Sequence, residues 1–157
     1  MSNINFKRCV RALQDKDPAV RKDAIQALAI MGNSQAVEPL INTLNDAAWD
    51  VRLYVVMALG VIADQQGVEP LAKALNDEDE GVRSAAADAL GGLGRLAVEA
   101  LISALSHEDY SVRRSAAEAL GDIGDPRAIK ALTLALRDSY WDVHKAAENA
   151  LKKMPSE

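Results

Sequence analysis

Apolar residues recur along this chain at spacings of three and four, which is the period of an α-helix and not of a strand. Two adjacent runs show the pattern clearly, and their apolar positions are Val37, Leu40, Ile41 and Leu44, followed by Val51, Val55, Ala58, Leu59 and Ile62. Neither run is long enough to bury its apolar side alone. The pattern therefore predicts two short helices packed as a hairpin.

The hairpin pattern repeats along the whole chain. A Val-Arg pair marks the second helix of each unit, at Val20-Arg21, Val51-Arg52, Val82-Arg83 and Val112-Arg113, and it returns as Val143-His144. The steps are 31, 31, 30 and 31 residues, and the short step coincides with a turn that lacks one residue, 95–97. A fixed period of this length is typical of a solenoid. We expect one domain over residues 1–157, with hairpins at about 3–32, 34–63, 65–94, 95–124 and 126–155.

Residues at the unit boundaries fit this division. We expect helix caps at Asn33, Asp64 and Asp125, and left-handed glycines that end second helices at Gly32, Gly94 and Gly124. The two ends of the chain carry polar residues where middle units are apolar or small. Glu148 and Lys152 stand at such positions in the last unit, and Lys7, Arg8 and Arg11 give the first helix a polar outer side. These residues predict a capped array.

Two segments closely resemble a known repeat: DEDEGVRSAAADALGGLG (77–94) and HEDYSVRRSAAEALGDIGDPRAIKALTLAL (107–136). They are similar to the short HEAT-like repeat of the phycobiliprotein lyase (PBS lyase) subunits and related proteins. The resemblance implies an all-α right-handed superhelix, an α-solenoid of about ten helices. It also implies that the second helices line the concave side that faces partners. Scaffolds, chromophore lyase subunits, an iron-dependent hydroxylase and DNA-repair proteins share this repeat, so the resemblance alone selects no function.

The resemblance also gives the recurring arginine a structural role, a ladder between repeats formed with an aspartate six residues earlier. Asp15 and Arg21 keep this spacing, as do the equivalent pairs of the next two units. The later units depart from it, with His107 ahead of Arg113 and His144 after Asp138. We expect any ladder there to be weaker or sensitive to pH.

Composition and charge narrow the function classes. Hydrophobic residues make up 49% of the 157 residues and charged residues 26%, as in a soluble globular domain, and no apolar run is long enough to span a membrane. We expect a cytoplasmic protein. The net charge of −5 disfavours nucleic acid, because such binding is driven by basic patches. The single cysteine, Cys9, lies among apolar helix positions and is interpreted as a core residue.

Candidate chemistry is sparse. No His, Cys, Asp and Glu residues cluster with the spacing of metal ligands, and the iron-dependent hydroxylase has several His-Glu pairs where this chain has only His107-Glu108. The glycines at 91–94 end a helix and do not form a phosphate-binding loop. We therefore predict no catalytic residue, no metal site and no cofactor.

The face of the second helices turned away from the core carries the functional prediction. It holds the positions two and one before each valine and two, three, six and ten after it. Most aromatic residues of the chain fall in the opening turns of these helices, and aromatic side chains and methionine are enriched at protein interfaces. The alternative interpretation is that solenoid curvature covers part of this stripe. The predicted partner-binding residues are Trp49, Leu53, Tyr54, Met57, Tyr110 and Trp141.

The sequence thus favours a non-enzymatic protein-binding module or scaffold. Its partner is a protein of unidentified class, or a second copy that associates through the apolar stripe of the second unit. The alternatives are a subunit of a phycobilin lyase-like or chaperone-like complex and, less favoured, a nucleic-acid-binding HEAT protein, because seven acidic and four basic residues occupy the outward positions.

Overall fold

The computed structural model describes residues 3–155, and these form ten α-helices and no strand. Each predicted repeat range contains one pair of helices. The pairs are α1 (Asn3–Ala12) with α2 (Pro18–Met31), α3 (Val37–Thr43) with α4 (Trp49–Ile62), α5 (Val68–Ala74) with α6 (Glu80–Gly92), α7 (Val98–Ala104) with α8 (Tyr110–Ile123), and α9 (Ile129–Ala135) with α10 (Trp141–Lys153). Short 3-10 turns precede the first helices from α3 onward: η1 (Ser34–Ala36), η2 (Gln65–Gly67), η3 (Gly94–Ala97) and η4 (Pro126–Ala128).

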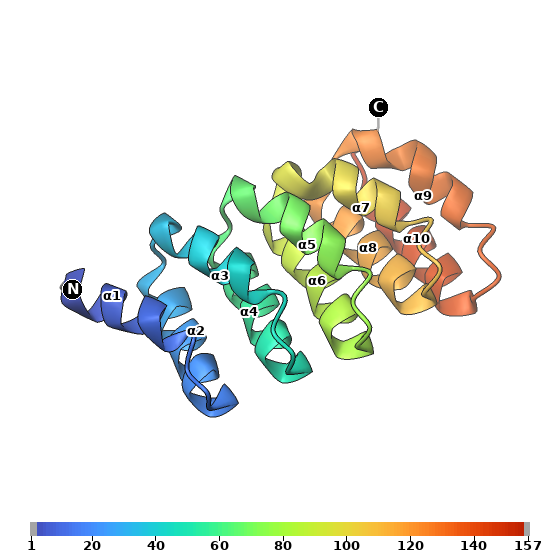
Figure 1. The fold of residues 1–157 in the computed structure, drawn as a ribbon. Helices are drawn as coiled ribbons and strands as arrows, with labels where there is room; N and C mark the ends of the chain where they lie inside the picture. The colour runs from blue at the N-terminus through green and yellow to red at the C-terminus, as the bar shows by residue number, and fades with distance from the viewer. Residues whose placement is uncertain (1–2, 156–157) are drawn as a thin grey trace.

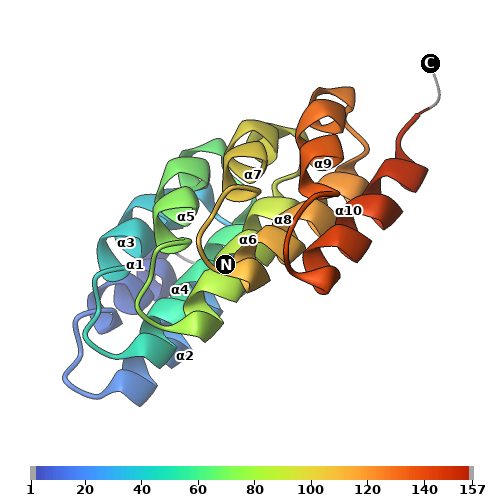
Figure 2. The same ribbon diagram turned by 90° about the vertical axis from the view of Figure 1, so that its right-hand side faces the viewer.

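The helices form two layers. Figures 1 and 2 show the odd-numbered helices on one side of the array and the even-numbered helices on the other, with the two termini at opposite ends. The even helices pack against one another in the order α2, α4, α6, α8 and α10, whereas successive odd helices hardly meet. Because the even layer is the more closely packed, the array curves toward it. The predicted all-α solenoid is confirmed, and the even helices line its inner face.

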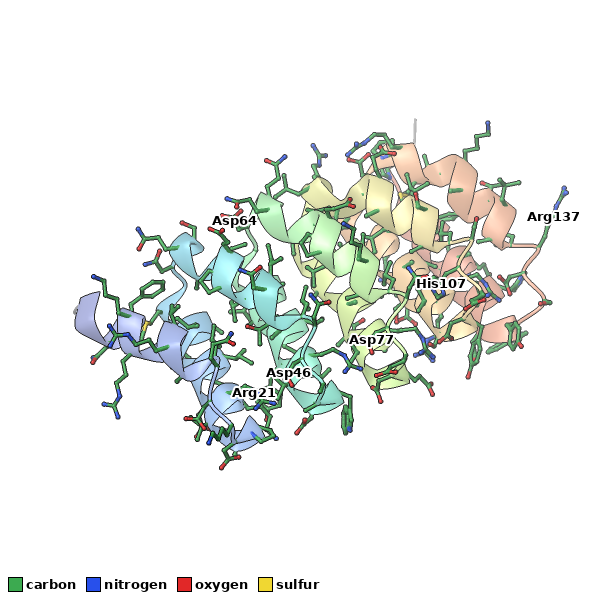
Figure 3. All side chains as sticks on the ribbon, in the orientation of Figure 1. Arg21, Asp46, Asp64, Asp77, His107 and Arg137 are labelled. Atoms are coloured by element: carbon green, nitrogen blue, oxygen red, sulfur yellow. The ribbon has the colours of Figure 1, made fainter. Side chains whose placement is uncertain are left out.

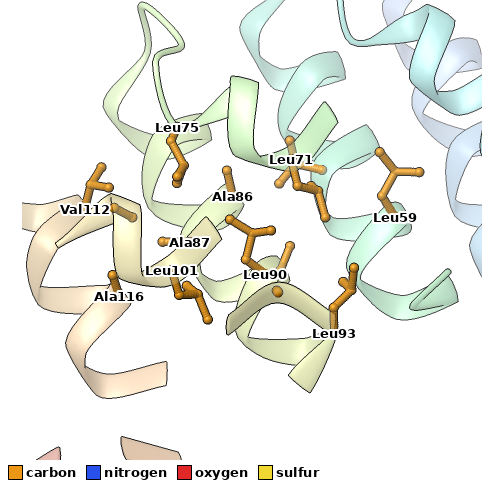
Figure 4. Close-up of a cluster of buried hydrophobic side chains, with 14 of the residues drawn as sticks. Leu59, Leu71, Leu75, Ala86, Ala87, Leu90, Leu93, Leu101, Val112 and Ala116 are labelled. Carbon is orange, nitrogen blue, oxygen red and sulfur yellow. The ribbon is translucent and has the colours of Figure 1, made fainter. Parts of the chain in front are cut away.

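The core lies between the two layers and runs the length of the array. Figure 4 shows its central part, where Leu59, Leu71, Leu90 and Leu101 meet side chains from neighbouring units. All four leucines are almost completely buried. Each unit therefore completes its core with residues of the next unit, as solenoid packing requires.

Small residues set the spacing of the even helices. A Cβ atom built on Gly60 of α4 would lie 2.9 Å from the Ala89 Cβ of α6, and one on Gly121 of α8 would lie 2.8 Å from the Ala150 Cβ of α10. Real Cβ atoms do not approach so closely. Glycine at these positions lets the helix backbones pack together.

The predicted turn residues act largely as expected. Asn33, Asp64 and Asp125 each accept a hydrogen bond from the backbone N–H two residues later, although they cap the 3-10 turns and not the α-helices that follow. Gly32 and Gly124 take the left-handed conformation at the ends of α2 and α8. Gly94 is also left-handed but begins η3, because α6 has already ended at Gly92, with Leu93 as its C-cap.

An arginine of each even helix, apart from α10, joins its own turn to the next one. In Figure 3, Arg21, Asp46, Asp77 and His107 follow one another along the turns between paired helices. The Arg21 Nη1 donates to the backbone oxygen of Asp15 at 2.8 Å, and its Nη2 donates to Asp46 Oδ1 at 2.8 Å. The aspartate six residues earlier therefore supplies its carbonyl, whereas the carboxylate comes from the next repeat.

The expectation of a weaker ladder in the later units is wrong for the two arginine steps there. Arg83 donates to Asp109 Oδ2 at 2.8 Å, because Asp109, two residues after His107, supplies the carboxylate that His107 lacks. Arg113 binds Asp138 with two hydrogen bonds of 2.7 and 3.1 Å. His144 takes the arginine position in α10, and its Nδ1 lies 2.6 Å from the Leu136 backbone oxygen.

Candidate partner-binding face

The inner face, formed by the outward positions of the even helices, contains hollows between neighbouring helices. The first lies between α2 and α4 and has a volume of 480 Å³. Its lining is apolar apart from Gln26 and the Tyr54 hydroxyl. The lining residues are Ile25, Gln26, Ala29, Ile30, Tyr54, Met57, Ala58 and Val61.

A second hollow of 470 Å³ lies between α4 and α6. Met57 and Val61 line both hollows, so these two side chains of α4 form the ridge between them. The floor of the second hollow is made of small residues, among them Ala85 and Gly92. Asp88 is the one charged residue in its lining.

Large apolar side chains around these hollows are exposed. Ile30 is 81% exposed, Val61 69% and Met57 56%. Ile30 and Val61 occupy the same register, ten residues after the valine of the repeat, and this position becomes Gly92, Asp122 and Lys153 in later units. At this register, apolar residues are therefore confined to the first two units. A patch of this kind is typical of a binding surface.

Charges beside the apolar hollows are mostly acidic and partly uncompensated. Lys22 is held by Asp50 at 2.5 Å, and its ammonium group lies 5.7 Å from the centre of the Tyr54 ring. Asp88 forms no ion pair with another described residue. The surrounding helices remove part of its hydration, which raises the pKa of Asp88, and Arg114 only partly offsets this effect.

The C-terminal part of the inner face is polar. A hollow of 310 Å³ between α8 and α10 contains Trp141 and several charged side chains. Trp141 is 70% exposed. Lys153, which lines this hollow at the other end of α10 from Trp141, pairs with Asp122 at 2.6 Å, and Lys145 pairs with Glu148 at 2.7 Å. Both lysines of this hollow are thus paired with carboxylates within the chain.

The structure separates the six predicted binding residues into groups. Tyr54 and Met57 line the first hollow, whereas Trp141 lies in the polar hollow at the other end. Trp49 is exposed at the start of α4, and Leu53 is half-buried against the core. The Tyr110 ring stacks on Tyr140 at 4.6 Å, so part of its surface is already covered within the chain.

The sequence-based selection left out Ile30, Val61 and Asp88. Ile30 and Val61 occupy the same position of their units, and this position is apolar only in the first two units. A comparison of the units at this position could have identified both residues. Asp88 follows Met57 by one repeat, so the alignment of the units places both at the same hollow.

The side chains capable of chemistry have structural surroundings. His107 Nδ1 accepts a hydrogen bond from the backbone N–H of Asp109 at 3.0 Å, and His144 contacts the Leu136 carbonyl. Cys9 is half-buried against the core. Among residues 3–155, no three His, Cys, Asp or Glu side chains are grouped closely enough to hold a metal ion.

No helix in the described part of the chain is long and apolar enough to cross a membrane.

The fold has close counterparts among solved structures. A chain in the complex of CpcE and CpcF of phycocyanin lyase from Nostoc sp. PCC7120 has a TM-score of 0.72 and 22% identity, with 95% of this chain and 99% of that chain covered. A designed armadillo repeat protein in complex with the peptide (KR)4 has a TM-score of 0.64 and 23% identity, with coverage of 96% and 82%. An engineered protein from the Northeast Structural Genomics Consortium has a TM-score of 0.62 and 26% identity, with coverage of 94% and 78%.

No curated protein matches the chain. The family model of HEAT repeats matches residues 6–49, 37–97 and 92–152, which together span nearly the whole sequence. The chain therefore belongs to the HEAT-repeat family.

Proposed function

We propose that this protein is a non-catalytic binding module that holds a protein partner on the inner face of its even helices. The observation that carries the proposal is the pair of apolar hollows around the ridge of Met57 and Val61. Water wets these exposed side chains in the free protein, and a partner that covers them gains about 25 cal/mol for each Å² of apolar surface buried.

The repeat architecture supports this proposal. A solenoid presents an extended surface whose floor is fixed by packing within and between units, so little ordering is required on binding. The designed armadillo repeat protein, 23% identical and of similar fold, is in a complex with the peptide (KR)4, so a solenoid of this general fold can hold a chain segment. The similarity to the lyase chain, at 22% identity, supports the fold and not a shared function.

The test is capture of partners from the native source by the purified protein and by two variants. Met57→Lys places a charge on the ridge, and Leu134→Lys places the same charge on α9, on the opposite layer. Both side chains are exposed, at 56% and 62%, so both variants should fold. We expect mass spectrometry to identify a protein held by the wild type and by Leu134→Lys but lost from Met57→Lys.

Retention of every partner by Met57→Lys would place the binding surface elsewhere and refute the proposal. Circular dichroism of both variants provides the folding control, because a helical spectrum equal to that of the wild type excludes unfolding as the cause of any loss.

A further inference from the structure

The charge of the inner face changes along the array. In the first three units the outward positions hold four acidic residues and one basic residue, which are Asp23, Asp50, Glu80, Asp88 and Lys22. In the last two units they hold three acidic and three basic residues. The apolar hollows lie in the acidic part, and Asp88 is the charged residue in their lining, so an occupant of the second hollow meets its negative charge.

The separation of the two hollows selects the conformation of the occupant. They lie on either side of α4, and packed helices are about 8–10 Å apart, so the hollows are separated by about the same distance. Two side chains seven positions apart in a helix lie on one face and about 10.5 Å apart. In a strand, side chains on one face are spaced by about 6.6 or 13 Å, which matches the hollows less well.

Asp88 fixes the position of a complementary charge. It belongs to α6 and so lies on the far side of the second hollow from the ridge of Met57 and Val61. A side chain three or four residues beyond the second anchor of a helical occupant would come next to it. A lysine or arginine there would form an ion pair with the Asp88 carboxylate and so compensate for the hydration that the neighbouring helices remove.

We propose that the partner segment is a basic amphipathic helix that crosses α2, α4 and α6; this inference rests on the proposed binding function. It places two large apolar side chains, seven positions apart, in the two hollows and a lysine or arginine beside Asp88. A second copy of this chain fits less well, because its own inner face and its net charge of −5 are acidic and would repel this surface.

The test uses two synthetic helical peptides of about 18 residues. Both carry phenylalanines seven positions apart; one has lysines three and four positions after the second phenylalanine, and the other has glutamates there. We expect the lysine peptide to bind about five- to tenfold more tightly than the glutamate peptide at low salt. In NMR spectra of the isotope-labelled protein, it should shift the amide signals of Ile30, Val61 and Asp88.

Two variants make the assignment specific. Asp88→Lys should reverse the preference between the peptides, and Met57→Lys should abolish binding of both. Equal binding of the two peptides to the wild type, an unchanged preference in Asp88→Lys, or signal shifts confined to α8 and α10 would each overturn the inference. A wild-type dimer that Met57→Lys dissociates, seen by light scattering without peptide, would assign the hollows to a second copy and overturn it as well.

Failure of the inference remains separate from failure of the proposed function. If neither peptide binds while Met57→Lys still loses a captured protein partner, the inner face binds a protein of different chemistry. If capture also shows no dependence on Met57, both proposals fail.

Discussion

Single arginines each make several polar contacts that join neighbouring units, and Arg52 is an example. Its guanidinium donates two hydrogen bonds of 2.8 Å to Asp77 and one of 2.9 Å to the Asp46 backbone oxygen. The side chain is only 8% exposed. Since the contacts saturate a planar donor fork, lysine could not reproduce them.

Removal of Arg52 leaves the largely buried Asp77 carboxylate without its ion-pair partner, with only the hydrogen bond from the Asp79 backbone N–H. We expect Arg52→Ala to lower the free energy of unfolding by about 3–5 kcal/mol, measured by urea denaturation. The matched control is Arg114→Ala, which removes an arginine whose nearest carboxylate, Glu118, is 3.9 Å away on a more exposed surface. Its expected cost is at most about 0.5 kcal/mol. Similar losses of unfolding free energy in the two variants would show that the arginine ladder makes no special contribution to stability.

Asp125 gives a prediction on pH. Hydrogen bonds from the Arg127 side chain and backbone lower the pKa of Asp125 to about 2, from an ordinary 3.8. A carboxylate with a lowered folded-state pKa stabilises the fold above its unfolded pKa, and the contribution disappears as the pH falls through the folded pKa. The difference in Tm between the wild type and Asp125→Asn should therefore be constant above about pH 5 and should close toward pH 2. Thermal unfolding across this range measures it, and a difference independent of pH would contradict a stabilising role of the ionised Asp125 carboxylate.

At the scale of helices, glycine and alanine determine how closely the even layer packs. Gly121 faces Ala150, and a Cβ atom there would also lie 2.7 Å from the Ala150 Cα, which is backbone and cannot rotate away. Gly92 is also helical, but a Cβ atom on it would meet only the Gly60 carbonyl oxygen, at 3.6 Å. The two glycines of similar sequence context thus have different roles.

We expect Gly121→Ala to destabilise the protein by about 1–3 kcal/mol, because α8 and α10 must separate to accept the methyl group. Gly92→Ala should be neutral or stabilising by up to about 1 kcal/mol, since alanine favours the helix and the space is free. Chemical denaturation of both variants provides the comparison. Equal effects would show that helix propensity, and not the close approach of α8 and α10, determines the response at Gly121.

Helix pairs were predictable because their signal is periodic, and every unit repeats it. The exposure of single residues was less predictable. Leu53 and Val61 both belong to the predicted outward face, yet Leu53 is half-buried against the core while Val61 is 69% exposed. Exposure of an outward position depends on which side chains of the neighbouring units cover it. Sequence spacing within one unit carries no information on that coverage.

At the scale of the whole molecule, the main contacts between helices run within a unit or between neighbouring units. A solenoid of this kind is held together by intrinsic unit stabilities and nearest-neighbour interfaces. The N-terminal and C-terminal ends of the inner face can therefore differ in stability as they do in charge.

This architecture predicts that a destabilising substitution affects mainly the helices that contact it. Gly121→Ala should increase amide hydrogen exchange in α8 and α10 and leave the protection of α2 and α4 nearly unchanged. Hydrogen exchange followed by mass spectrometry resolves these segments. An equal increase along all helices would mean that the array unfolds as one cooperative unit.

The arginine ladder has a consequence for how such a protein changes over evolutionary time. Each step uses the same parts, an arginine on one even helix and an aspartate in the next turn, as in Arg21 with Asp46 and Arg113 with Asp138. Deletion or duplication of a whole unit from the middle would bring a new arginine and a new aspartate together in the same geometry. Recombination between units can thus alter the number of hollows on the inner face in a single event, without a compensating substitution at the new junction.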